Sequence, residues 1–387
     1  MAKSNKKRES LETTFGRPRL GALSTYPKQI VDRIYHLRDA HEGWGAITIW
    51  VELQEEFGYL PKEIPSIDSI NRYLKQEGFV PERQPSGHMP ISSCKSTVKN
   101  VHDLWEMDAE GTVPVSGLNY ISNINIKDAK SKVHCMAFPV QVKGQMSQPK
   151  TESYFWTLRL AFEQWGLPKA IQMDRDSIFI DSTSKSPYPS RLHLFLISLG
   201  IKVYFINVPP PQKQSMVERS HQTINRQTLK GQHYDYWKEL FEFTIKRRRR
   251  INEKLPNRML DKRAPLEAFP EAKHSGRIYK IAQEDQYVSM SRIYKYLSKC
   301  YWYRKVSKDK TLSLNSKIYY LKSAQRESQL QIKFCNRSKK LIFRDVKEQI
   351  IAKIPIKNFS ILNIMGGTND DLILMKKKLF RVKDFPL

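Results

Sequence analysis

Three carboxylates in different local settings are the residues best suited to chemistry in this chain of 387 residues. Asp108 ends a strand-like run, Asp174 ends a second one, and Glu218 lies where a Pro-rich loop gives way to a helix. Cleavage of a phosphodiester uses two hard cations about 3.5–4 Å apart, one for the nucleophile and one for the leaving oxygen. Because Mg²⁺ binds a few carboxylates together with water and phosphate, these residues predict a site for two Mg²⁺ or Mn²⁺ ions.

Each of these carboxylates also has an ordinary structural explanation. A solvated Asp often follows a strand, and a Glu in the first turn of a helix is stabilised by the helix dipole. Taken singly, these explanations are the better ones. The three residues together, in this order and on these kinds of element, favour the metal site. Asp176, two positions after Asp174, stays an alternative ligand that joins or replaces it.

The charge of the chain indicates a polyanionic partner. Lys and Arg number 66 against 39 Asp and Glu, a formal net charge of +27. Each phosphate that a basic protein neutralises releases counterions and adds affinity, so such a surplus favours nucleic acid. A soluble basic protein, a ribosome-associated protein or a membrane-surface protein would also be basic, but none of these needs carboxylates at the ends of buried strands.

Membrane and secretory classes are not indicated. No apolar run approaches the roughly 18 residues of a membrane span, and the charged start, Met1 to Arg8, is not followed by the apolar stretch of a signal peptide. The cysteines lack the spacing of zinc ligands and fit a reduced protein: Cys94, Cys135, Cys300 and Cys335. We expect a cytoplasmic, DNA-associated protein without a membrane partner.

The composition and periodicity of the sequence divide the chain into seven segments. In order, we expect a flexible basic arm at 1–25, a helix-turn-helix DNA-binding domain at 26–80, a linker at 81–100, an α/β core at 101–258, a connector at 259–304, a small β-barrel at 305–360 and a basic tail at 361–387.

The core alternates strand-like and helix-like stretches. Besides the strands that end at Asp108 and Asp174, strands are expected at 119–126, 133–142 and 202–208, and helices at 152–165, 191–199, 215–230 and 234–253. A Ser/Pro-rich surface insert is expected at 181–190. Three strands, helix, strand, helix, strand, helix is an α/β arrangement with a mixed sheet of five strands.

Two surfaces are predicted to contact DNA. In the N-terminal domain, short helices joined by tight turns favour a helix-turn-helix over an ordinary three-helix bundle, with Ser66 as the N-cap of the last helix and these contact residues: Ser66, Ser69, Asn71 and Arg72. In the core, the helix that carries Glu218 presents a polar stripe at helical spacing, extended by basic residues: Arg219, His221, Gln222, Asn225, Arg226 and Lys230. His221 is expected either to meet phosphate near the metals or to be a plain surface residue.

Two further patterns have competing interpretations. The run of five basic residues at 246–250 resembles a nuclear-import signal, but it lies in a predicted helix, so a solvated or DNA-facing patch is favoured. Tyr301, Trp302 and Tyr303 could stack bases, yet an aromatic core cluster at the entry to the barrel is favoured.

These segments resemble the retroviral integrases and the related DDE insertion-sequence transposases, over roughly residues 26–345. The matching pieces are Trp105-Glu106-Met107-Asp108, Ile171-Gln172-Met173-Asp174 with Phe179, Pro211-Gln212 with Val217-Glu218-Arg219, and the flanks Pro65-Ser66-Ile67-Asp68-Ser69-Ile70 and Arg263-Ala264-Pro265-Leu266-Glu267-Ala268-Phe269. The chain departs from the family at Asp176, where a Gly is usual. It also departs in the 43 residues between Asp174 and Glu218, a length that the insert at 181–190 absorbs.

The resemblance implies a ribonuclease H-like core at 101–258 in which Asp108, Asp174 and Glu218 bind the metals. It implies a DNA transposase that cuts element ends and joins the freed 3′-hydroxyl to target double-stranded DNA, acting as a homo-oligomer, at least a dimer. Whether an accessory ATPase takes part stays open. The alternatives are a ribonuclease H-type nuclease that cuts without joining and a transposase-derived DNA-binding regulator without catalysis.

Overall fold

The computed structural model describes residues 21–80, 98–173, 188–205 and 215–381, with side chains in these ranges except at 215–218 and 380–381. The chain forms two compact units, residues 1–87 and 88–387. The predictions for most of the basic arm, most of the linker and most of the insert lie outside the described residues, as do those for Asp174, Asp176, Phe179, Pro211 and Gln212. In the described ranges, no helix is long and apolar enough to cross a membrane.

The first unit consists of three short helices: α1 (Lys28–Ala40), α2 (Ala46–Glu55) and α3 (Ile67–Gln76). Their apolar faces meet through fully buried Ile34, Ile49 and Ile70. Arg38 at the end of α1 fastens the unit, because its guanidinium donates to the carbonyl oxygens of Trp44 at 2.7 Å and Phe79 at 2.6 Å. The expected N-cap is present, since the Ser66 hydroxyl accepts from the Ser69 N–H at 3.2 Å.

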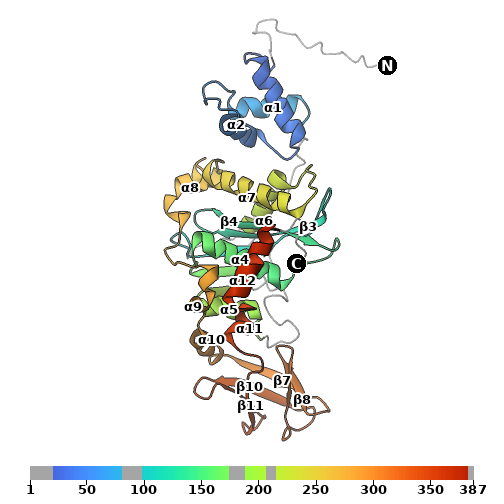
Figure 1. The fold of residues 1–387 in the computed structure, drawn as a ribbon, viewed down its shortest axis with the longest axis vertical. Coiled ribbons are helices and arrows are strands. Elements are labelled where there is room, and N and C mark those ends of the chain that lie inside the picture. Colours follow the sequence, from blue (N-terminus) through green and yellow to red (C-terminus); the bar gives the residue numbers. More distant parts are fainter. Residues whose placement is uncertain (1–20, 81–97, 174–187, 206–214, 382–387) are drawn as a thin grey trace, which may run out of the picture. The chain divides into compact units, whose positions relative to one another are not determined.

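The second unit is built on a mixed sheet (Figure 1), which confirms the expected α/β class. Its strands are β1 (Trp105–Ala109), β2 (Val113–Val115), β3 (Asn119–Asp128), β4 (His134–Val142), β5 (Ala170–Met173) and β6 (Lys202–Phe205). β3 pairs antiparallel with β1, β2 and β4, while β5 pairs parallel with β1 and β6. Because β1 and the short β2 pair with different parts of β3, the sheet is five strands wide. β2 was missing from the sequence prediction.

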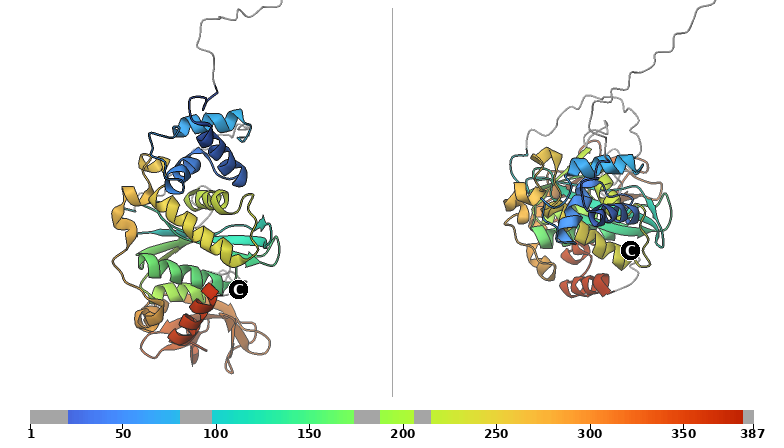
Figure 2. Two further views of the ribbon diagram at one scale, coloured as in Figure 1. Left: turned by 45° about the horizontal axis from the view of Figure 1, so that its top comes forward. Right: turned by 90° about the horizontal axis from the view of Figure 1, so that it is seen from above.

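Helices cover both faces of this sheet (Figure 2). They are α4 (Thr151–Trp165) and α5 (Arg191–Ser198) on one face, and α6 (Ser215–Thr228) and α7 (Trp237–Glu253) on the other. All four were expected. α4 ends at Gly166, whose φ is +76° and whose N–H bonds to Phe162 O at 2.8 Å. A Cβ at this glycine would collide with Ser275 and Arg277, so the stop requires glycine.

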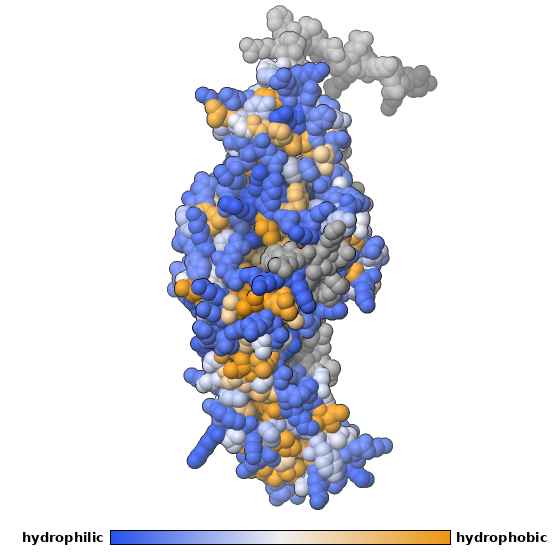
Figure 3. Space-filling view, in the orientation of Figure 1, coloured by the Kyte–Doolittle hydropathy of each residue, from blue (hydrophilic) through white to orange (hydrophobic). Residues whose placement is uncertain are grey.

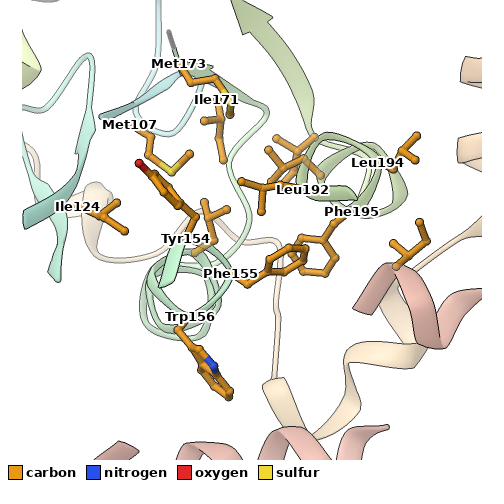
Figure 4. Close-up of a cluster of buried hydrophobic side chains, with 14 of the residues drawn as sticks. Met107, Ile124, Tyr154, Phe155, Trp156, Ile171, Met173, Leu192, Leu194 and Phe195 are labelled. Atoms are coloured by element: carbon orange, nitrogen blue, oxygen red, sulfur yellow. The ribbon is translucent and has the colours of Figure 1, made fainter. Parts of the chain in front are cut away.

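The main core lies between the sheet and α4 with α5 (Figure 4). Met107 of β1, Ile124 of β3 and Ile171 of β5 point toward Tyr154 on α4. Trp105 stacks on Phe162 with ring centroids 5.9 Å apart. Because successive residues of a strand point to opposite faces, this packing of Trp105 and Met107 turns Glu106 and Asp108 toward the other face.

A chain of short helices connects the core to the C-terminal part. They are η2 (Arg258–Leu260), α8 (Pro265–Ala268), η3 (Pro270–Lys273), η4 (Ile281–Gln283), α9 (Glu284–Tyr287) and α10 (Met290–Leu297). A buried ion pair fixes this connector to α4: Arg159 donates twice to the Glu284 carboxylate at 2.7 Å, with side chains 4% and 0% exposed. Tyr279 donates to the same carboxylate, and Arg159 also donates to Met365 O at 2.6 Å.

Beyond the connector the chain forms two small antiparallel sheets. One contains β7 (Tyr301–Lys305), β10 (Gln329–Cys335), β11 (Lys340–Arg344) and β12 (Ile350–Pro355), in the order β12-β11-β10-β7; the other contains β8 (Thr311–Leu314) and β9 (Lys317–Tyr320). Trp302, Phe334 and Phe343 are buried between them and the connector. The first strand begins four residues before the boundary expected for a small barrel at 305–360, and a closed barrel remains a prediction.

The last segment differs from the basic tail expected at 361–387. It contains α11 (Ile361–Met365) and α12 (Asn369–Arg381), and α12 packs back on the second unit through buried Leu372 and Leu379. Lys376 of α12 forms an ion pair with Glu163 of α4. Lys377 and Lys378 are exposed, whereas Lys376 and the two buried leucines hold the helix against the rest of the unit. On the visible face of the molecule hydrophilic residues dominate and hydrophobic ones occur in separate patches (Figure 3).

The buried imidazole of His193 should make the stability of the second unit depend on pH. His193 packs against Phe205 and Tyr296 with ring centroids 5.2 Å away in each case, and burial lowers its pKa to about 4. As the pH falls below about 6.5, the His193 imidazole is protonated in the unfolded chain but stays neutral in the folded chain. Stability that is present at neutral pH is therefore lost on acidification.

We expect His193→Phe to remove the loss of folding stability that His193 causes at pH 5, because the variant keeps an aromatic ring in the site without a titrating group. Urea unfolding at pH 7 and pH 5 measures it. The wild-type chain should lose about 2 kcal/mol more than the variant between the two pH values. Equal losses in both proteins would show that His193 does not titrate in this way.

Candidate active site

Strand β1 carries an alternating acidic pattern on one face. Glu106, Asp108 and Glu110 are spaced two apart, so they share the face opposite Trp105 and Met107. The side chains of Asp108 and Glu110 are each 17% exposed. Carboxylates this deeply placed need polar partners, and these partners come from β3 and α6.

Strand β3 supplies a matching row of polar residues. Register places Asn125 opposite Asp108 and Lys127 opposite Glu106, and the Glu110 N–H bonds to Asn123 O at 2.9 Å. Directly opposed residues of paired strands point to the same face. The sheet therefore presents a polar layer, defined here as Asp108, Glu110, Asn123 and Asn125 with His221 and Asn225 of α6.

His221 joins α6 to this layer. Its ring is 6% exposed; Nδ1 lies 2.7 Å from Asn125 Nδ2, and Nε2 lies 3.3 Å from Asp108 Oδ2. Because the amide N–H of Asn125 donates to Nδ1, the ring hydrogen is carried on Nε2 and is directed at Asp108. His221 thus holds one oxygen of the Asp108 carboxylate.

One turn further along α6, Asn225 holds Glu110. Asn225 donates from Nδ2 to Glu110 Oε1, and its own Oδ1 accepts from Asn123 Nδ2 at 3.1 Å. Burial raises the pKa of Glu110, opposed by nearby His221 and by the hydrogen bonds from Asn225 and Asn123. Two positions of one helix, four residues apart, therefore bind Asp108 of β1 and Glu110, the residue that follows this strand.

A second buried network supports the far side of α6. The Ser220 hydroxyl lies 2.9 Å from His134 Nδ1, and burial, with Lys127 and Arg248 nearby, lowers the pKa of His134 well below its usual value. Arg248 of α7 donates to the carbonyl oxygens of His134 and Cys135 at 3.0 and 2.8 Å. α6 is thus fixed against both β4 and α7.

Of the three proposed metal ligands, the structure describes only the Asp108 side chain. Glu218 lies in α6, but its side chain is outside the described residues, as is the whole of Asp174. Within the described ranges, no group of three or more His, Cys, Asp or Glu residues is arranged to hold a metal ion. The meeting of the three carboxylates stays a prediction.

The polar stripe expected on α6 divides between two faces. His221 turns into the polar layer, where it meets Asp108, so it is not the plain surface residue that was one of the two expectations for it. A contact with phosphate near the metals stays a prediction. The remaining predicted DNA contacts are exposed: Arg219, Gln222 and Arg226 on one side of α6, at spacings of three and four, and Lys230 in the turn after it. Because a side chain that reaches DNA must be exposed, these four are the ones still suited to that role.

In the first unit, the predicted contact residues lie at the start of α3. Ser66 and Arg72 are exposed, and Ser69 and Asn71 are partly exposed. The hydroxyls of Ser66 and Ser69 lie 3.0 Å apart and are engaged in the N-cap. DNA binding by these residues remains a prediction.

The basic run at 246–250 is divided between the interior and the surface, which corrects in part the expectation of a solvated or DNA-facing patch: Lys246 and Arg249 are exposed and Arg250 is partly exposed. Arg247 and Arg248 are 1% and 3% exposed. Arg247 donates to Gln227 Oε1 at 2.6 Å, and Arg248 donates to Gln164 Oε1 at 2.7 Å as well as to two carbonyl groups. These guanidinium groups anchor α7, since each has fixed acceptors inside the fold.

Sequence reasoning missed Glu110, Asn123, Asn125 and the inward role of Asn225. The signal was available: polar residues alternate with apolar ones through Glu106-Met107-Asp108-Ala109-Glu110 and Asn123-Ile124-Asn125-Ile126-Lys127. Period-two alternation in two neighbouring strands predicts a polar face on both, and a polar face inside a core predicts a helix with complementary side chains.

No family model matches the chain. Among solved structures, it is similar to the catalytic core of BIV integrase, at 15% identity and a TM-score of 0.30 over 44% of this chain and 95% of that one. It is also similar to the catalytic core of HTLV-2 integrase in complex with magnesium, in a trimeric form (13%, TM-score 0.32, 43% and 95%) and a dimeric form (13%, TM-score 0.30, 43% and 94%). These values are too low to transfer an activity or a residue role to this chain.

Asn225→Ala should destabilise the second unit, because it removes the amide that donates to the buried Glu110 carboxylate. An unsatisfied buried acceptor costs about 1–3 kcal/mol, and urea unfolding at neutral pH measures the loss. Gln222→Ala, at an exposed position of the same helix, serves as the control and should change stability by less than about 0.5 kcal/mol. If the two variants were equally stable, the Asn225–Glu110 contact would make no measurable contribution to the free energy of unfolding.

Proposed function

We propose that this protein is a metal-dependent polynucleotidyl transferase that cuts the ends of a DNA element and joins the freed 3′-hydroxyl to target DNA. The setting of Asp108 carries the proposal. It is a partly exposed carboxylate at the border of a buried, oxygen-rich layer, and a helix that bears a basic outer side holds it in place. Phosphodiester chemistry needs the first feature to hold cations, and a polyanionic substrate needs the second.

Asp174 is the proposed second ligand. β5 pairs parallel with β1, with Ile171 opposite Trp105 and Gln172 opposite Glu106, and Met173 is its last residue. A parallel register that continued by one or two residues would place the next position of the chain beside Asp108. This supports Asp174 as a ligand, with Asp176 as the alternative.

Glu218 is the proposed third ligand. It precedes His221 by three residues in α6, and residues three apart share one side of a helix. His221 contacts Asp108, so this side of α6 is the one that faces the end of β1. The proposal that Glu218 completes the site rests on this spacing.

The described part of the site fits a hard cation. Among the described residues, three buried acceptors have no hydrogen-bond partner: Glu110 Oε2, Asn123 Oδ1 and Asn125 Oδ1. Carboxylate and amide oxygens are the ligands that Mg²⁺ prefers. Bound Mg²⁺ would activate the attacking oxygen and neutralise charge on the leaving one.

The protein residues in this proposal position groups and need not form a covalent intermediate. Asn125 orients the His221 ring, and His221 binds Oδ2 of Asp108, which leaves Oδ1 for the cation. Water attacks the phosphodiester at the element end and displaces a 3′-hydroxyl. That hydroxyl then attacks a phosphodiester of the target in line, so one phosphodiester forms as another breaks.

The substrate would be held by basic residues outside the metal site. Arg219 and Arg226 on the exposed side of α6, with Lys230 in the turn after it, are proposed to contact the DNA backbone near the cleaved bond. Asn71 and Arg72 of α3 are proposed to help recognise the element ends. Because two ends must be joined to one target, we propose a homo-oligomer, at least a dimer.

Asp108→Asn should abolish turnover and leave DNA affinity largely intact, because it removes a charged metal ligand without touching the basic surfaces. The assay combines purified protein, Mg²⁺ or Mn²⁺, labelled element-end DNA and a supercoiled target. We expect cleavage and joining to fall on the order of a thousandfold, while binding measured without divalent cations stays within about twofold. Asp235→Asn, at a side chain 70% exposed, is the control and should keep full activity.

The products of the same assay separate the alternatives. Joined products support the proposal, cleavage without joining supports a ribonuclease H-type nuclease, and binding without turnover supports a transposase-derived regulator. Full activity of Asp108→Asn would refute the assignment of this residue as a ligand.

His221→Ala should weaken metal use rather than DNA binding, because His221 positions a ligand and is buried away from the surface. Loss of a residue that orients a metal ligand costs roughly 10–100-fold in metal affinity or activity. The measurement is the Mg²⁺ concentration for half-maximal cleavage. We expect it to rise in His221→Ala and to remain unchanged in the exposed control Asp235→Asn; equal values in both variants and the wild type would contradict the positioning role.

A further inference from the structure

The outer face of the sheet formed by β7, β10, β11 and β12 carries an unusual combination of side chains. Its inner face is apolar and buried, with Trp302, Ile332 and Phe343 each no more than 2% exposed. The alternate residues form the outer face. On β7 they include the aromatic residues Tyr301 and Tyr303. Among the glutamine, isoleucine and other side chains of the remaining strands, this face carries four basic residues: Lys333, Lys340, Arg344 and Lys353.

The two tyrosines form an exposed aromatic pair. Tyr301 is 57% exposed and Tyr303 is 40% exposed, and their ring centroids lie 5.8 Å apart with an interplanar angle of 83°. The Tyr303 hydroxyl accepts from Gln331 Nε2 at 2.9 Å, which anchors that ring. This corrects the sequence prediction for this triplet: Trp302 alone enters the core, while the tyrosines on either side of it face solvent.

Basic side chains continue from this tyrosine pair across the outer face of the sheet. Lys333 lies directly opposite Tyr301, with its Nζ 5.9 Å from the ring centroid. Ile342 and then Lys353 continue the same row, and Arg344 lies opposite Gln331 in the next row. Aromatic faces at one edge and positive charges at spacings of a strand or two are complementary to a chain of bases joined by phosphates.

The net charge of this part of the chain also favours a polyanionic partner. Between residues 301 and 360 there are fifteen Lys and Arg against four Asp and Glu. All of these residues are described, and the four acidic ones lie outside the strands of the outer face: Asp309, Glu327, Asp345 and Glu348. The Asp345 carboxylate, for example, accepts hydrogen bonds from the backbone N–H groups of Lys347 and Gln349, each at 2.9 Å.

We propose that this outer face binds an unpaired strand of DNA, with bases stacked on Tyr301 and Tyr303 and phosphates on Lys333, Arg344 and Lys353. Stacking on an open aromatic ring requires a base whose face is accessible, and a base inside a duplex has no such face. The surface therefore favours single strands over duplex. The inference rests on the proposed function for its choice of DNA, and it adds a second contact, remote from Asp108, for a strand that cleavage has released.

Fluorescence anisotropy with labelled oligonucleotides tests this proposal. The full-length wild-type protein without divalent cations is titrated with a single strand of about 15 nucleotides, an abasic strand of equal length and a duplex of the same sequence. The double substitution Tyr301→Ala with Tyr303→Ala should weaken single-strand binding roughly tenfold. It should leave abasic-strand and duplex binding unchanged. Tyr301→Phe with Tyr303→Phe keeps both rings and should bind as the wild type does.

Tyr320→Ala is the matched control, because Tyr320 is a tyrosine 61% exposed on the separate sheet β8–β9. It should bind the single strand normally. The proposal is overturned if the double alanine variant binds the single strand like the wild type, if it loses single-strand and duplex binding equally, or if Tyr320→Ala loses as much.

A charge substitution gives a second readout. Lys333→Gln should weaken binding to the single strand and the abasic strand alike and should reduce the salt dependence, because it removes a phosphate contact and not a stacking face. Unchanged salt dependence would argue against a phosphate at this position. Since no step needs divalent cations, the result stands whether or not Asp108→Asn later proves the catalytic proposal wrong.

Discussion

A hydrogen bond between a helix and a strand decides the geometry of the candidate site. His221 reaches from α6 into the sheet and binds Asp108, and it can do so only because Asn125 on the neighbouring strand fixes its ring. Pairing of β1 with β3 sets the register of this contact. Apolar packing of Trp105 and Met107 on the opposite face prevents a slip of one residue, which would turn every acidic side chain of β1 into the hydrophobic core.

The polar layer differs in kind from the core on the other side of the sheet. Around Phe162 and Tyr154 the apolar side chains fit together by shape, and truncation of one of them would leave a cavity. In the layer, amides and an imidazole satisfy carboxylates, while several oxygens keep unused lone pairs. Such a layer is costly unless something with positive charge completes it. The same sheet thus combines an apolar side with the polar side on which the proposed cation site rests.

Regular periodicity made much of the fold predictable from the sequence. The long strands β3 and β4 and the helices α4 to α7 have clear apolar patterns and ends, such as Gly166 after α4. Long-range partners were not predictable. Arg247 and Arg248 look like surface charge because every residue of the run 246–250 is basic, so the sequence does not show which of them face inward. Only the packing of α7 reveals their buried acceptors. His221 and Gln222 were assigned to one stripe, yet the 100° between them separates an interior position from a solvated one. The convergence of Asp174 and Glu218 on Asp108 stays a prediction.

The ion pair between Arg159 and Glu284 has a consequence for how this protein is divided into parts. The guanidinium belongs to the core, its carboxylate to the connector, and its third acceptor, Met365 O, to the segment near the C-terminus. A fragment that ends after α7 would lose the Glu284 carboxylate and Met365 O, the acceptors that hold the Arg159 guanidinium. Loss of a partner from a buried ion pair is strongly destabilising, so the α/β core and the segments that follow it depend on each other for stability.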